Sequence, residues 1–156
     1  AASDVYKRQP DFLLENQCYI GIQQPESLCT TGLGFGAQKS SPVVQKMMEC
    51  YDSISFTDQK KSTFACPWLN DKVIRSFGKV SNEDITYLKE VTVYPPRFFD
   101  PLSTGNTKNL LCDETVSIHH YAATWAGNKQ RWKRKLIRFF GEDRYFKLKK
   151  LFRRVQ

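Results

Sequence analysis

Proline residues divide this chain into short segments, and their positions restrict which elements each segment can form. Proline is tolerated in the first turn of a helix, so the sequence predicts helices that begin near Pro42 and near Pro67. The β-branched run from Val91 to Tyr94 ends at two consecutive prolines, as a strand would. Helices and strands that alternate in this way predict an α/β architecture.

The segments between these prolines carry further patterns. An apolar run over Cys18–Ile22 predicts a buried strand, preceded by a helical turn at Leu13 and Leu14. Over residues 115–120, apolar and polar residues alternate as in a strand. Residues 97–109 have the composition of a loop. The glycine-rich residues 30–37 are better explained by a tight turn between a strand and a helix than by a phosphate-binding loop, because the spacing is GxGxG.

Both predicted helices have an apolar side. Ser41 is expected to be the N-cap of the first helix, whose apolar face would consist of Val44, Met47, Met48 and Tyr51. The second helix would turn Leu69, Val73, Ile74 and Phe77 to one side and end at Gly78.

Composition sets the class of protein. A chain of 156 residues with 40% hydrophobic residues can bury one core, and no apolar run approaches the roughly 18 residues that span a bilayer. The five cysteines include no CxxC pair, so we expect reduced thiols in a cytosolic chain. Cys66 precedes Pro67 at a helix start, where a thiolate is stabilised; a buried, inert thiol is the favoured interpretation because no His or Lys adjoins it.

Basic residues are concentrated at one end of the chain. Residues 128–156 hold twelve Lys and Arg against two acids, whereas residues 1–127 hold twelve bases against fourteen acids. Two sets of apolar residues recur there at helical spacing: Trp132, Leu136, Phe139 and Phe140, then Leu148, Leu151, Phe152 and Val155. This pattern predicts an amphipathic helical tail that either lies on an anionic membrane surface or packs its apolar faces on the domain. Nucleic-acid binding is a weaker alternative, because the body of the chain has no nucleic-acid-binding motif.

The two histidines, His119 and His120, are adjacent at the end of a predicted strand, where α/β folds place ligand sites. Neighbours on a strand point to opposite faces, so one imidazole would face a pocket and the other would be structural. Imidazole can bind a divalent metal or donate to a diphosphate oxygen, although a satisfied buried histidine explains the residue types equally well.

Four segments, in order, are similar to the C-terminal half of bacterial glycosyltransferase family 32, the DXD-containing sugar transferases of capsular polysaccharide synthesis. They are TTGLGFGAQKSSP, TFACPWLNDKVI, VTVYPPRFFDPL and TVSIHHYAATW. The resemblance runs from about Asp11 to about Lys150. It implies a GT-A type fold, a nucleotide-sugar donor, Mn²⁺ or Mg²⁺, and transfer of a hexose with retained configuration to a glycan or lipid-linked acceptor.

The resemblance also implies roles for individual residues. His119 would contact the metal or the diphosphate, with His120 beside it. Trp125 would form a wall of the donor pocket, and packing in the core is an equally good explanation of this residue. Thr31 and Gly32 match the loop that faces the sugar and the acceptor. No residue is assigned as catalytic.

The sequence departs from the family at its most characteristic motif, because it contains no Asp-any-Asp. Asp4, followed by Val5, matches the second aspartate of that motif and would be a metal ligand; however, residues 1–10 lack periodicity and are expected to be an artefact or a non-native leader. Residues 11–127 would then form the C-terminal part of the catalytic domain, and this fragment alone is expected to be inactive. The alternative is a non-enzymatic basic module that binds membranes or nucleic acid.

Overall fold

The fold is built around a four-stranded sheet with the strand order β2-β1-β4-β3. The computed structural model describes residues 10–24, 26–52, 54, 65–102 and 108–119. Strand β1 (Cys18–Ile22) pairs antiparallel with β2 (Cys29–Ala37) and parallel with β4 (Thr92–Tyr94). Strand β3 (Thr86–Tyr87) pairs antiparallel with β4. The sheet is therefore mixed, and together with its helices it confirms the α/β class.

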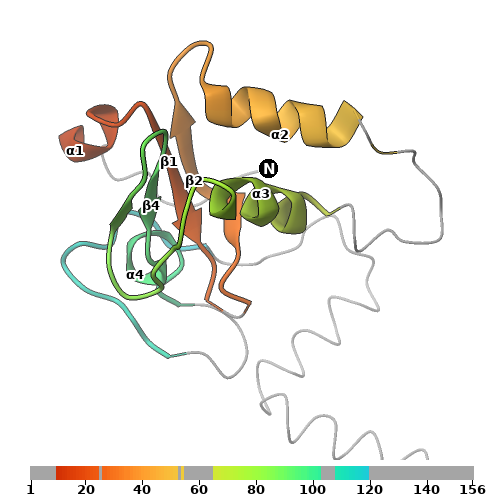
Figure 1. Ribbon diagram of the computed structural model, residues 1–156. Helices are drawn as coiled ribbons and strands as arrows, with labels where there is room; N and C mark the ends of the chain where they lie inside the picture. The colour runs from red at the N-terminus through yellow and green to blue at the C-terminus, as the bar shows by residue number, and fades with distance from the viewer. Residues whose placement is uncertain (1–9, 25, 53, 55–64, 103–107, 120–156) are drawn as a thin grey trace, which may run out of the picture.

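In the described residues, four helices accompany the sheet (Figure 1): α1 (Asp11–Leu14), α2 (Pro42–Asp52), α3 (Cys66–Arg75) and α4 (Pro96–Phe99). Both predicted proline starts are confirmed. The carbonyl of Ser41 accepts the first helical hydrogen bond from the Gln45 N–H, as an N-cap residue does. Within the described part of the chain, no helix is both long enough and apolar enough to span a membrane.

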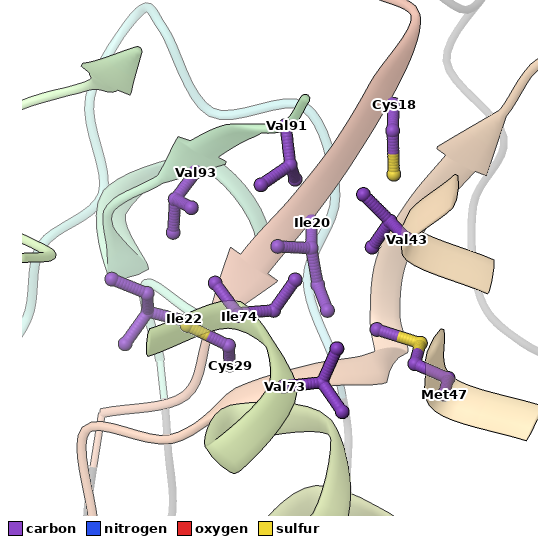
Figure 2. Close-up of a cluster of buried hydrophobic side chains, with 10 residues drawn as sticks. All are labelled: Cys18, Ile20, Ile22, Cys29, Val43, Met47, Val73, Ile74, Val91 and Val93. Atoms are coloured by element: carbon purple, nitrogen blue, oxygen red, sulfur yellow. The ribbon is translucent and has the colours of Figure 1, made fainter. Parts of the chain in front are cut away.

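The larger core lies between the sheet and helices α2 and α3. Figure 2 shows its ten buried side chains, which come from β1, β2, the β4 region, α2 and α3. Ile20 and Ile22 of β1 point into it, with Ile74 of α3 and Val43 of α2, and all four are fully buried. This face of the sheet is aliphatic.

The opposite face of the sheet is aromatic. Tyr19 and Tyr94, which alternate with the aliphatic strand residues, pack with Phe98 and Phe99 of α4 and Leu13 of α1. The rings of Tyr19 and Phe99 are stacked, with centroids 6.1 Å apart and an interplanar angle of 13°. Because adjacent residues of β1 and β4 serve opposite cores, all five residues of β1 and all three of β4 are buried.

The glycine-rich segment is a strand and not the predicted turn between a strand and a helix. Two of its three glycines are explained by the aromatic face: a Cβ at Gly34 would lie 2.5 Å from the Phe99 ring, and one at Gly36 would overlap the Tyr19 ring. Gly21 of β1 also lies against Phe99. The sequence pattern predicted a turn, whereas in the structure these glycines lack the side chains that would keep the aromatic rings away from the sheet.

Helix α2 is rotated by one residue from the predicted orientation. Val43 and Met47 are its buried residues, whereas Val44 is only half-buried and Met48 is 62% exposed. Met47 was assigned correctly, but the predicted face with Val44, Met48 and Tyr51 lies away from the core. Apolar residues occupy adjacent positions in VVQKMM, so the sequence does not distinguish the two faces.

Two predictions near the end of the described chain are wrong. Residues 97–109 are not all loop, because α4 extends to Phe99 and fits the aromatic face. Residues 115–119 are not a strand; Val116 and Ser117 instead both donate backbone hydrogen bonds to the carbonyl of Phe98. Two adjacent N–H groups that meet one carbonyl cannot form a strand ladder, in which alternate residues face the partner.

Two of the three glycines of β2, Gly34 and Gly32, give a matched test of the aromatic packing. Gly34→Ala is expected to lower the free energy of unfolding by about 1–3 kcal/mol, because its methyl group would overlap the Phe99 ring. Gly32→Ala should change it by less than about 0.5 kcal/mol, because only the Thr30 hydroxyl lies near that position, at 3.6 Å. Urea unfolding of the two variants measures the difference, and equal stabilities would contradict the packing explanation.

Candidate functional site

Strand β2 leaves regular pairing in its middle, beside the start of α3. Thr30 pairs with Gly21 of β1, but Phe35 pairs with the preceding residue, Ile20, so residues 31–34 have no partner position on β1. This bulge contains Thr31 and Gly32, the residues that the resemblance places next to the sugar and the acceptor. Bulges commonly redirect side chains at functional sites.

The Thr31 side chain is directed to helix α3, where it joins a small polar cluster. The Asn70 amide nitrogen (Nδ2) donates to the Thr31 hydroxyl (Oγ1) at 3.0 Å and to the Cys66 sulfur at 3.0 Å. The Thr31 hydroxyl and the Cys66 sulfur are themselves 3.3 Å apart. Asn70 is only 2% exposed, whereas Cys66 is exposed, so the cluster extends from the interior to the surface.

Cys66 is therefore exposed, and the expectation that its thiol would be buried is wrong. It is the first residue of α3, with Pro67 next to it, and its thiol faces the Thr31 hydroxyl. This hydroxyl belongs to strand β2, which is distant from Cys66 in the sequence, so the sequence neighbours of Cys66 do not reveal the contact. None of the five cysteines, all of which lie in the described ranges, forms a disulfide.

Tyr51, in the last turn of α2, adds a phenol to the same cluster. Burial raises the pKa of Tyr51, and the charge of Cys66 and a hydrogen bond with it raise the pKa further. The Tyr51 side chain is 38% exposed, so this member of the cluster reaches the surface. We call Thr31, Cys66, Asn70 and Tyr51 the bulge cluster.

A carboxylate one residue after Asn70 fixes α3 against the sheet. The Asp71 carboxylate accepts a hydrogen bond from the backbone N–H of Cys29 at 3.0 Å, and it forms an ion pair with Arg75 at 2.8 Å. Arg75 also donates to the carbonyl of Ser27, which precedes β2. Burial, and then the charge of Asp71, raises the pKa of the Cys29 thiol to about 12, so this thiol is neutral and structural.

His119 lies in a different part of the structure from the bulge cluster. The segment that leads to it bonds to α4, through Val116 and Ser117, and Val116 packs against the aromatic core. Thr31 contacts α3, which covers the aliphatic face. His119 is half-buried.

The remaining predicted site residues, Asp4, His120 and Trp125, lie outside the described residues, as does the tail at 128–156. Within the described ranges, no group of three or more His, Cys, Asp or Glu side chains is gathered as metal ligands would be. Of the two metal ligands that the resemblance implies, His119 and Asp4, only His119 lies in the described ranges.

Comparison with known proteins gives no assignment for this chain. It matches no protein-family model, no curated protein and no solved structure.

Sequence reasoning identified Thr31 and Gly32 but missed Asn70 and Tyr51 as their partners. Asn70 follows Cys66 by four residues on α3, so the two side chains share one helix face, and this spacing was the available signal. Tyr51 was predicted to lie on the core face of α2, and because the predicted orientation of that helix was wrong, its contact with Cys66 was not expected.

The burial of the cysteines predicts their order of reaction with an aromatic disulfide reagent at about pH 8. Cys66 and Cys112 are exposed and should react first. Cys18 and Cys29 are buried and their pKa values are raised to about 11 and about 12, so they should react only after unfolding. Peptide mass spectrometry identifies the labelled residues, and the denatured chain supplies the control with five reactive thiols. Early labelling of Cys29 would contradict this core assignment.

Proposed function

We propose that this chain is the C-terminal part of a glycosyltransferase that moves a hexose from a nucleotide sugar to a glycan or lipid-linked acceptor, with retained configuration and a GT-A type fold. One observation carries the proposal: the residues that resemble the family's sugar-facing loop, Thr31 and Gly32, lie in a bulge that interrupts β2. The α/β architecture and the order of the four similar segments support it.

The bulge cluster has the chemistry to hold a sugar. Sugar hydroxyls both donate and accept hydrogen bonds, and the Thr31 and Tyr51 hydroxyls can do the same. Gly32 is exposed, and a Cβ there would meet only the Thr30 hydroxyl, at an ordinary contact distance of 3.6 Å, so packing does not explain its glycine. A glycine beside a polar cluster lets a ligand approach the backbone closely.

The donor and its metal would be bound by a second set of residues, outside the bulge cluster. His119 would contact the metal or the diphosphate, His120 and Trp125 would line the donor pocket, and Asp4, if native, would be a metal ligand. Mn²⁺ or Mg²⁺ would supply charge neutralisation of the leaving diphosphate. The proposed arrangement has no role for nucleic acid.

The location that fits this function is the cytoplasm, with peripheral contact at the inner face of the cell membrane. Twelve bases in residues 128–156 would attract anionic lipid headgroups, each by about 1 kcal/mol at most. The same charge supports the second candidate function, a non-enzymatic module that binds membranes or nucleic acid. Nucleotide-sugar binding separates the two, because only the transferase requires it.

The experiment uses a protein in which this chain is joined to its native upstream half. UDP- and GDP-sugars are titrated with and without Mn²⁺, and metal-dependent binding is expected for one of them. His119→Ala should then lower turnover about 10- to 100-fold, the usual effect of losing a partner at a metal site. Asp113→Ala, an exposed residue in the same segment, is the matched control and should leave turnover unchanged.

The acceptor side of the proposal is tested in the same protein with Gly32→Val. This variant should raise the KM for the acceptor while the donor KM stays the same, because the added side chain occupies the space beside Thr31. Its melting temperature should not change. An unchanged KM for the acceptor would show that the bulge does not contact the acceptor. The absence of metal-dependent nucleotide binding would favour the non-enzymatic binding module.

A further inference from the structure

Helix α2 has apolar residues on two sides, and only one side faces the core. Val43 and Met47 are buried against the sheet, whereas Met48 is 62% exposed and Val44 is half-buried on the adjacent side. A surface helix ordinarily has one apolar stripe and polar residues elsewhere. The second stripe of α2 is thus suited to contact something beyond the sheet.

A groove lies along this second stripe, between α2 and the end of β2. Its volume is about 760 Å³, and Phe35 of β2 forms part of its wall together with Val44 and Met48. Glu49 and Asp52 are its charged lining residues, and among the described residues that line it there is no Lys or Arg. The groove therefore combines an apolar wall with negative charge.

We propose that this groove receives the basic C-terminal segment, residues 128–156, of the same chain. The segment has the complementary composition, with a net charge of +10 and apolar residues at helical spacing, among them Trp132 and Leu136. Apolar side chains would pack on Val44 and Met48 while neighbouring bases pair with Glu49 and Asp52. An anionic membrane would be repelled by this acidic groove.

Covalent connection makes this contact favourable even where each interaction is weak. Trp132 follows His119 by thirteen residues, a stretch that spans up to roughly 45 Å when extended. A segment tethered in this way has an effective concentration in the millimolar range at a site within its reach. The bases on the other side of the segment remain available for lipid headgroups, so the contact is compatible with attachment to a membrane.

Photo-crosslinking in the full 156-residue chain tests the contact directly. A benzophenone amino acid in place of Met48 should crosslink within one molecule to peptides from residues 128–156. The matched control carries the same amino acid in place of Tyr87, which is 75% exposed on β3 at the other edge of the sheet and should give no such crosslink. Crosslinks that join two copies would assign the groove to a dimer and overturn the proposal.

Charge reversal tests the electrostatic part. Glu49→Lys with Asp52→Lys should lower the crosslink yield from position 48 about tenfold, because attraction becomes repulsion. Glu83→Lys with Asp84→Lys makes the same change in net charge on exposed residues outside the groove and should leave the yield unchanged. Equal yields in the two variants, with unchanged melting temperatures, would also overturn the proposal, as would the absence of any crosslink to residues 128–156.

Discussion

The stacking of Phe99 on Tyr19 is the contact on which the arrangement of this fold depends. It brings α4, encoded some eighty residues after β1, against the centre of the sheet, and it does so only because Gly21 and Gly34 leave room for the ring. The side chains that alternate with Tyr19 along β1 fill the aliphatic core under α2 and α3. One strand thus organises both cores, and the position of β2 follows from its pairing with that strand.

The bulge in β2 follows from the same constraint. Gly34 and Gly36 keep the strand close to the aromatic layer, while Asn70 and Cys66 hold Thr31 on the other side against α3. The strand is therefore held on both faces at a point where it has lost its β1 partner. Within the bulge, the Gly32 N–H donates to the Thr30 hydroxyl at 3.3 Å, so a side-chain acceptor takes the place of a ladder bond.

Local signals predicted the elements whose cause is local. Pro42 and Pro67 mark helix starts through the chemistry of proline itself, and the apolar run at Cys18–Ile22 is a strand buried on both sides. The glycine-rich strand was not predictable, because its cause is a ring contributed from far along the chain. The same holds for the candidate site: the resemblance suggested Thr31, but its hydrogen bonds with Asn70 and Cys66 can be seen only in the folded chain.

The two attachments of α3 to β2 have a consequence for how the bulge cluster would respond to a ligand. Asp71 accepts a hydrogen bond from the Cys29 N–H, and Asn70, one residue earlier, donates one to the Thr31 hydroxyl. Helix α3 therefore cannot rotate about its axis without breaking one of these two hydrogen bonds. The orientation of the Thr31 hydroxyl is set before any ligand arrives. A sugar that bound there would meet a rigid wall, and little of its binding free energy would be spent on ordering the protein.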